Sequence, residues 1–201
     1  MWKIQTDEFT LTIRPDELAE SPRTSMDNVG HMVCWHKRYR LGDEHSFATP
    51  TDLFDYLKEE YGKAWARKVV MLPLYLYDHS GITMSTAPFS CPWDSGQVGW
   101  IWADKDELRK DLPKKGRESA AEWQRRAEDY LRGEVHTYDQ YLCGEVVRYV
   151  LEDSDGAIID SLCDIYLDKS RSAVEQILTD YLDWGGILTA EQIAALRAAA
   201  A

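Results

Sequence analysis

The stretch KVVMLPLYLYD, residues 68–78, decides the fold class of this chain. Apolar and aromatic side chains dominate it, and it is too apolar to be a strand with one face in solvent. Pro73 interrupts the run, and proline cannot donate a hydrogen bond to a neighbouring strand. We therefore expect a largely buried strand over residues 68–78, with a bulge or an edge position at Pro73.

Further strands are expected on both sides of this run. A polar bridge over residues 79–96 leads to a strand over residues 97–103, and a short strand is expected upstream over residues 31–36. Residues 2–16, WKIQTDEFTLTIRPD, alternate apolar and polar side chains around a polar centre, which predicts an opening hairpin. The runs EVVRYVLE and AIIDSLCDIYL flank the turn sequence DSDG, residues 153–156, and predict a second hairpin.

Capping residues mark the helices. Thr49 can cap a helix, Pro50 fits its first position, and Gly62 supplies a left-handed stop, which predicts a helix between them. The same kinds of signal predict four more helices, over residues 105–112, 118–142, 173–182 and 190–201. The last four residues, 198–201, are expected to fray.

Together these elements predict an α+β fold, a mainly antiparallel sheet with helices packed on one side. The chain has 201 residues, 44% hydrophobic and 11% aromatic, which is enough to bury one sizeable core. No linker rich in Gly, Ser or Pro divides the sequence. We therefore expect a single domain over residues 1–201, with an acidic last third over residues 134–201.

The sequence also indicates a compartment. No apolar run approaches the roughly 18 residues that a membrane span needs, and the start MWKIQTDEF lacks the basic and apolar regions of a signal peptide. Four scattered cysteines are too few for a disulfide framework in a chain of this size. We expect a cytoplasmic protein with reduced thiols and no contact with a membrane.

The charge is strongly negative and unevenly distributed. The formal net charge is −12, and residues 134–201 hold 13 acidic against 4 basic side chains. Such a field repels phosphate backbones and attracts basic protein surfaces. The basic side chains of residues 109–126 are interleaved with acidic ones, as on a solvated helix. Direct binding to duplex DNA is therefore disfavoured, and a partner with a basic surface is favoured.

Three blocks of the sequence carry a resemblance. The block LPLYLYDHSGITMSTAPFSCPWDSGQVGW, residues 72–100, resembles an uncharacterised family of small proteins encoded by bacteriophages, prophages and conjugative elements. DNVGHMVCWHKRYRLGD, residues 27–43, and EVHTYDQYLCGEVVRYVLE, residues 134–152, are similar to further blocks of that family. Where the family continues with a strand rich in Trp and Tyr, this chain has DSLCDIYLD. The resemblance implies a genomic setting and no activity.

That setting favours a binding protein over an enzyme. Small acidic proteins of mobile elements often act by binding host proteins, including restriction and CRISPR components, with carboxylates in place of phosphates. We therefore expect an accessory protein that binds a host macromolecule in the bacterial cytosol and inhibits a defence system, with no cofactor. Loops with mixed polar and aromatic content are common ligand sites. The expected binding residues are Tyr77, His79, Trp93, Asp94, Ser95 and Gln97.

A Cys/His/Asp-based hydrolase or metalloenzyme, with a site within residues 34–94, is the alternative. Residues two apart on a strand face the same side, so Cys34 and His36 would present two ligands, and His79 with Cys91 would complete a tetrahedral zinc site. This spacing is looser than that of common zinc clips.

Two further enzymatic interpretations use neighbouring residues. In the first, Cys91 is a nucleophile, His79 is its base, and Asp78 or Asp94 orients the imidazole. In the second, four aspartates hold Mg²⁺ for phosphoryl chemistry, namely Asp27, Asp43, Asp78 and Asp94. A purely structural interpretation assigns the same tryptophans to one face of the sheet and the same aspartates to turns.

Overall fold

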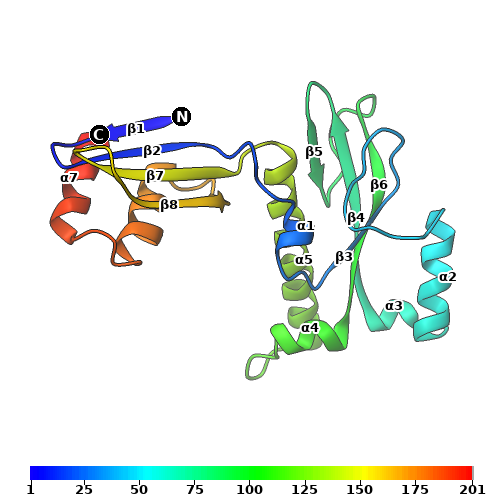
Figure 1. Ribbon diagram of the computed structural model, residues 1–201. Coiled ribbons are helices and arrows are strands. Elements are labelled where there is room, and N and C mark those ends of the chain that lie inside the picture. Colours follow the sequence, from blue (N-terminus) through cyan, green and yellow to red (C-terminus); the bar gives the residue numbers. More distant parts are fainter. Residues whose placement is uncertain (201) are drawn as a thin grey trace. The chain divides into compact units, whose positions relative to one another are not determined.

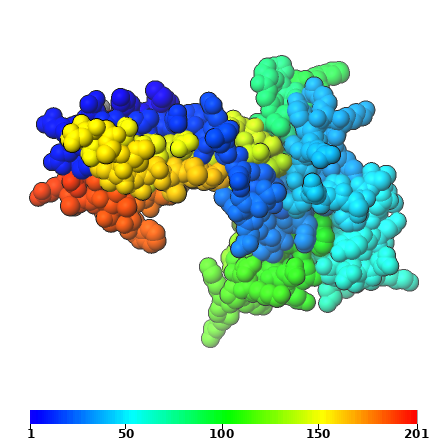
Figure 2. All heavy atoms as spheres, viewed as in Figure 1, coloured from blue at the N-terminus to red at the C-terminus, as the bar shows by residue number. Residues whose placement is uncertain are grey.

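The computed structural model describes residues 1–200, which form two compact units. The first, which we call the terminal unit, contains residues 1–20 and the chain from residue 144 onward. The second, the inserted unit, contains residues 21–143. Figure 2 shows that atoms from both ends of the sequence, blue and yellow to red, are mixed within the terminal unit. The polypeptide therefore leaves the terminal unit and returns to complete it.

The sheet of the terminal unit pairs the two predicted hairpins. Its strands run in the order β1-β2-β7-β8, and every neighbouring pair is antiparallel (Figure 1). The central pair joins distant parts of the sequence, because Phe9 faces Asp153 and Pro15 faces Val147. The strands are β1 (Trp2–Gln5), β2 (Phe9–Pro15), β7 (Val147–Asp153) and β8 (Ile158–Ile165).

Helices cover one face of this sheet. Strand alternation turns Leu11 and Ile13 of β2, and Leu151 of β7, to the same side, where they are buried. Ile177 and Leu196 pack against them from the helices. These helices are α6 (Ala173–Gln176), its π-helical continuation η1 (Ile177–Asp183) and α7 (Ala190–Ala200). The opposite face carries the alternate side chains of the same strands.

The inserted unit has its own four-stranded antiparallel sheet, in the order β3-β6-β4-β5. Pro73 lies where β5 does not yet pair with β4, since that pairing begins at Tyr75, and the register with β6 shifts between Leu74 and Tyr75. The predicted edge position and the predicted bulge thus both occur near Pro73. The strands are β3 (His31–Cys34), β4 (Val69–Asp78), β5 (Ile82–Ser85) and β6 (Ser95–Asp104).

Helices pack on both faces of this second sheet. On one face, Leu108 and Trp123 pack with Ile101 of β6, and on the other face Leu53 and Leu57 pack with Trp102 of the same strand. The first face is covered by α4 (Lys105–Asp111) and α5 (Ala120–Leu142), and the second by α2 (Pro50–Tyr61) and α3 (Trp65–Lys68). Strand β6 therefore has both faces buried over residues 101–103.

A buried arginine links the segment before β3 to α5. Arg23 lies in the short helix α1 (Pro22–Ser25), and its side chain is 3% exposed. Its guanidinium donates to both carboxylate oxygens of Asp43, at 2.7 and 2.8 Å, and to Glu134 at 2.9 Å. Glu134 in turn accepts the backbone N–H groups of Val29 and Gly30. Three charged side chains thus fasten the segment that leads into β3 to helix α5.

The α+β class with antiparallel sheets is confirmed, with two differences of arrangement. There are two sheets where one was expected, because the second predicted hairpin pairs with the opening hairpin and not with β4 and β6. Helices lie on both faces of the second sheet. Strand β3 ends at Cys34, two residues before its predicted end.

Two further predictions concern the end of the chain and the number of domains. Fraying was expected over residues 198–201, whereas helix α7 includes residues 198–200, and Ala201 lies outside the described residues. That residues 1–201 act as one domain stays a prediction about folding.

Candidate functional site

Three loops meet at one end of the inserted sheet, where β3 ends, β4 turns into β5, and β6 begins. They contain residues 35–41, 79–81 and 86–94. Hydrogen bonds and ion pairs between the loops hold them together, as described below. We name the side chains that these loops and the adjoining strand ends present the Trp93 surface, and define it as Arg38, Tyr77, Asp78, His79, Cys91, Trp93 and Asp94.

The backbone at this end of the sheet is held by local hydrogen bonds. The N–H of Asp78 donates to the carbonyl oxygen of Asp94 at 2.8 Å, which continues the β4–β6 ladder beyond its last strand pair. The N–H of His79 donates to Gly81 at 3.0 Å and closes the β4–β5 turn, in which Ser80 has a φ of 58°. The hydroxyl of Ser95 donates to the carbonyl oxygen of Cys91. The end of the loop that leads into β6 is therefore anchored, to β4 through Asp94 and to Ser95 through Cys91.

One carboxylate connects the three residues of the predicted nucleophile site. The Oδ2 atom of Asp94 lies 3.2 Å from Nδ1 of His79 and 3.6 Å from Sγ of Cys91, which donates to it. The sequence therefore brings these three side chains together as expected. In a nucleophile with its base, the imidazole lies next to the thiol. Here the Asp94 carboxylate lies next to both the thiol and the imidazole. The imidazole thus lies beside Asp94, and the described hydrogen bond of the thiol goes to Asp94 and not to His79.

Asp78 has a different partner from the one proposed for it. Its carboxylate forms an ion pair with Arg38 and accepts the hydroxyl of Tyr39 at 3.3 Å. The Arg38 guanidinium also lies over the Tyr39 ring, 5.3 Å from its centroid. Bonding to Asp78 raises the pKa of Arg38, so this cation stays charged. Asp78 therefore positions the loop over residues 35–41 and does not contact the His79 imidazole in any described bond.

The remaining predicted binding residues lie at the surface. Trp93 is 92% exposed, and Tyr77 is half-buried between the rings of His79 and Phe89, whose centroids are 6.1 and 5.6 Å away. Gln97 is exposed and its amide donates to the carbonyl oxygen of Gly99 at 3.3 Å. Residues 79–96 were expected to form one loop, but strand β5 forms within them and buries Met84, so the loop residues are 79–81 and 86–94.

The four proposed zinc ligands lie in different environments. Cys34 packs in the core beneath α5, and burial raises its pKa to about 12, which disfavours the thiolate that zinc requires. His36 lies beyond the strand end, stacks on Tyr39 at 5.0 Å and accepts the Tyr39 N–H. Across residues 1–200, no three of these four residues bring their ligand atoms within 4.8 Å of one another.

The four aspartates proposed for Mg²⁺ are also separated by their partners. Asp43 pairs with Arg23, Asp78 with Arg38, and Asp94 with His79. Asp27 is exposed before β3. Each paired carboxylate thus has a structural role in its own part of the inserted unit.

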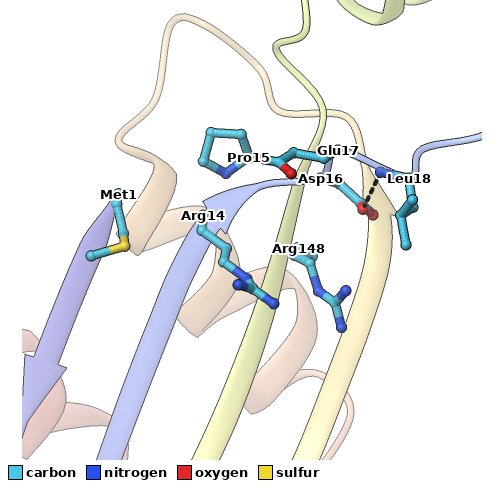
Figure 3. A pocket seen from close by; sticks show the side chains of 7 residues that line it. All are labelled: Met1, Arg14, Pro15, Asp16, Glu17, Leu18 and Arg148. Atoms are coloured by element: carbon cyan, nitrogen blue, oxygen red, sulfur yellow. Dashed lines mark hydrogen bonds between the residues drawn. The ribbon is translucent and has the colours of Figure 1, made fainter.

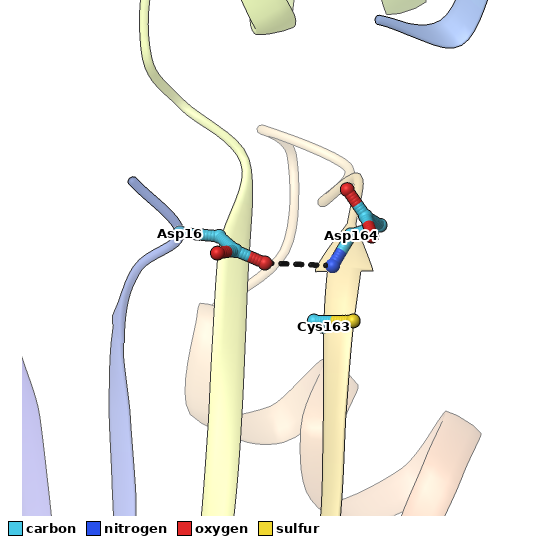
Figure 4. A group of neighbouring side chains, drawn as sticks. All are labelled: Asp16, Cys163 and Asp164. Carbon is cyan, nitrogen blue, oxygen red and sulfur yellow. Dashed lines mark hydrogen bonds between the residues drawn. The ribbon is translucent and has the colours of Figure 1, made fainter. Parts of the chain in front are cut away.

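A group of side chains that the sequence did not single out lies in the terminal unit. Asp16, Cys163 and Asp164 place ligand-type atoms within 4.8 Å of one another (Figure 4). Their polar atoms are already engaged, because Asp16 accepts the N–H of Asp164 at 3.0 Å and Asp164 accepts the N–H of Glu20 at 3.0 Å. A hydrogen bond to Asp164 raises the pKa of the Cys163 thiol. The group fastens the end of β8 to the chain that follows β2.

Comparison with known proteins adds no relative, since no protein-family model, no curated protein and no solved structure matches this chain. Within residues 1–200, no helix combines the length and the apolar character that crossing a bilayer requires. All four cysteines are free. The site must therefore be interpreted from its own geometry.

Proposed function

We propose that this protein binds a host macromolecule through the Trp93 surface, as an accessory protein of a bacteriophage or other mobile element. One observation carries the proposal: the side chain of Trp93 is 92% exposed, beside the point where hydrogen bonds of Cys91 and Asp94 fix the loop to the start of β6 and the end of β4. A large apolar side chain gains roughly 1.5 to 3 kcal/mol when it leaves water. Trp93 stays in water within its own fold, so this free energy is gained only when a partner covers the side chain.

The neighbouring residues suit a protein interface. Tryptophan, tyrosine and arginine are the residue types that most often dominate binding energy, and Trp93, Tyr77 and Arg38 all lie on this surface. The Asp78 and Asp94 contacts hold the loops in place before any partner arrives. Because binding then requires little further ordering of side chains, more of the contact energy is expressed as affinity.

Charge supports a partner with a basic surface. The terminal unit holds 16 acidic and 6 basic side chains, a net charge of −10, whereas the inserted unit is near neutral at −2. The acidic field steers basic proteins toward the molecule and repels duplex DNA. We place this partner in the host cytosol, and a host defence protein of the restriction or CRISPR type, inhibited by this contact, is the one that the resemblance of residues 72–100 favours.

The Cys/His/Asp enzyme is kept as a second candidate because Cys91, His79 and Asp94 do lie in contact. A hydrolase would need the His79 imidazole to turn from Asp94 toward the thiol. A metalloenzyme would need ligands other than the buried Cys34. Both requirements make this candidate weaker than the binding surface.

Affinity capture from host lysate, with matched tryptophan variants, tests the proposal. Trp93→Ala should weaken capture of the partner by at least about 30-fold, the loss expected for a central aromatic anchor. Trp184→Ala is the control, because Trp184 is 89% exposed in the terminal unit and outside this surface. It should change capture less than about threefold, and both variants should retain the wild-type circular dichroism spectrum. His79→Ala should leave capture largely intact.

Two results would reverse the ranking of the candidates. Equal capture by wild type and Trp93→Ala would remove the Trp93 surface from the interface. Recovery of no partner, with alkylation of Cys91 much faster than that of the exposed Cys163 and dependent on His79, would favour the enzyme. Elemental analysis of the purified protein should find no stoichiometric zinc if the binding function holds.

A further inference from the structure

A pocket of about 320 Å³ lies on the terminal unit where β2 ends. It is separate from the Trp93 surface and belongs to the other unit. Figure 3 shows two arginine side chains on neighbouring strands inside it, with the helices of the unit behind the sheet. The lining residues are Met1, Arg14, Pro15, Asp16, Glu17, Leu18 and Arg148.

The two arginines face each other directly. Arg14 of β2 and Arg148 of β7 are partners in the antiparallel register, so their side chains leave the sheet on the same face. Directly opposite residues have Cβ atoms about 4.5 to 5.5 Å apart, and like charges in this position destabilise a sheet. The pair therefore needs a compensating negative charge.

The protein does not supply that charge. Three other cations of the terminal unit have carboxylate partners, namely Lys169 with Glu145, Arg171 with Asp180, and Arg197 with Glu175. Over residues 1–200, neither Arg14 nor Arg148 has a side-chain hydrogen bond or ion pair. The Nε atom of Arg148 is also shielded from solvent without any acceptor. A buried donor without an acceptor destabilises the folded state, and a bound anion would remove this penalty.

The two carboxylates of the pocket differ in their availability. Asp16 accepts backbone N–H groups with both oxygens, from Leu18 at 3.2 Å and from Asp164 at 3.0 Å, and has no ion pair with either arginine among the described residues. Glu17 is exposed and has no described partner. Asp16 therefore shapes the chain at the pocket, whereas Glu17 opposes an incoming anion.

We propose that this pocket binds the phosphate group of a small phosphate monoester, with Arg14 and Arg148 as its ligands. Two guanidinium groups match the two negative charges of the ester, and each offers a planar fork of N–H donors to its oxygens. The volume exceeds that of a phosphate group, and Met1, Pro15 and Leu18 provide apolar walls for the rest of the molecule. A unit with a net charge of −10 repels long polyanions, so a small ligand is favoured over nucleic acid.

Isothermal titration calorimetry with glycerol 3-phosphate tests this site, and succinate serves as a dianion without phosphate. We expect saturable binding of the phosphate ester with a Kd of about 1 mM or tighter, and weaker binding of succinate. Arg148→Gln and Arg14→Gln should each weaken binding at least about tenfold. Glu17→Gln should strengthen it, because it removes the opposing charge. Lys3→Gln, which removes a cation outside the pocket, should change it less than about twofold.

The protonation of the ligand gives an independent test. The second pKa of a phosphate monoester is about 6, so affinity should fall between pH 7.5 and pH 5.5 if the dianion is bound. The Arg14 side chain is exposed, so Arg14→Gln should fold even if Arg148→Gln does not. The proposal is overturned if the wild type binds no glycerol 3-phosphate, if succinate binds equally well, or if Arg14→Gln binds like the wild type.

Discussion

The terminal and inserted units are both built on a four-stranded antiparallel sheet, yet they place chemically active side chains differently. The inserted sheet has helices on both faces, so its polar groups lie in the loops at the sheet end, as on the Trp93 surface. The terminal sheet has helices on one face, and polar strand side chains such as Arg14, near the end of β2, and Arg148, near the start of β7, lie on the other. The number of helical layers thus decides whether a site is made from loops or from strand residues.

The two units also differ in how they stabilise their charges. The inserted unit buries a charged network around Arg23, whereas the ion pairs of the terminal unit lie at the surface, with about 40 to 50% of each side chain exposed. Buried charges depend on their partners far more than exposed ones do. Removing one buried charge of the inserted unit should therefore cost more unfolding free energy than removing one charge of an exposed ion pair.

The largest effect is expected at Arg23. Arg23→Ala would leave the carboxylates of Asp43 and Glu134 without their cation, and should lower the free energy of unfolding of the inserted unit by about 3 to 5 kcal/mol. Urea denaturation followed by tryptophan fluorescence measures this well, because six of the eight tryptophans lie in the inserted unit.

Arg132→Ala is the control for this experiment. Arg132 lies on α5 with 45% of its side chain exposed, and pairs with Glu128 and Asp129 one turn away. Its loss should cost less than about 1 kcal/mol. Equal effects of the two substitutions would show that the Arg23 network is no more important than a surface pair.

A matched pair of core truncations tests whether the units fold together. Leu11→Ala in the terminal unit and Leu131→Ala in the inserted unit each remove a fully buried side chain, and each should cost about 2 to 5 kcal/mol. If residues 1–201 form a single domain, both variants shift one common unfolding transition in differential scanning calorimetry. Two transitions, each sensitive to only one variant, would contradict the single-domain prediction.

The smallest effect is expected from a surface pair under acid conditions. Hydrogen bonds from Arg126 lower the pKa of Glu118 from its usual 4.5 to about 2. A carboxyl group with a lowered pKa stabilises the folded state above its unfolded pKa, and this contribution disappears as the pH falls through the folded value. The stability difference between wild type and Glu118→Gln should therefore shrink from pH 4.5 toward pH 2.

Glu60→Gln is the reference for that titration, because Glu60 is exposed and has no ion pair among the described residues. It should show no comparable change over this pH range in urea denaturation. A constant difference between wild type and Glu118→Gln at all pH values would mean that the Arg126 pair does not perturb Glu118.

Local signals in the sequence predicted most elements but not their assembly. Thr49 and Gly62 bound α2 as expected, because capping and left-handed stops depend on neighbouring residues. The pairing of β2 with β7 depends on residues more than 130 positions apart, and strand alternation does not specify a partner. The second sheet was missed for this reason.

The candidate sites follow the same rule. Cys91, His79 and Asp94 were predicted together because one hairpin and one loop bring them within reach. The Cys34 and His36 pair was predicted from strand alternation, and it is wrong because β3 ends between them. Arg14 and Arg148 gave no signal, since each arginine alone is typical of a solvated strand position. Two like charges that face each other on paired strands can be recognised only when the strand pairing is known.

The discontinuous path of the terminal unit has a consequence for synthesis on the ribosome. The hairpin of β1 and β2 emerges first, and β7, which covers the other edge of β2, emerges only after residues 21–143 have been translated. At about 5 to 20 residues per second, translation of this segment takes roughly 6 to 25 s. An isolated two-stranded hairpin is only marginally stable in water, so the apolar side of β2 stays accessible to chaperones and proteases throughout that interval.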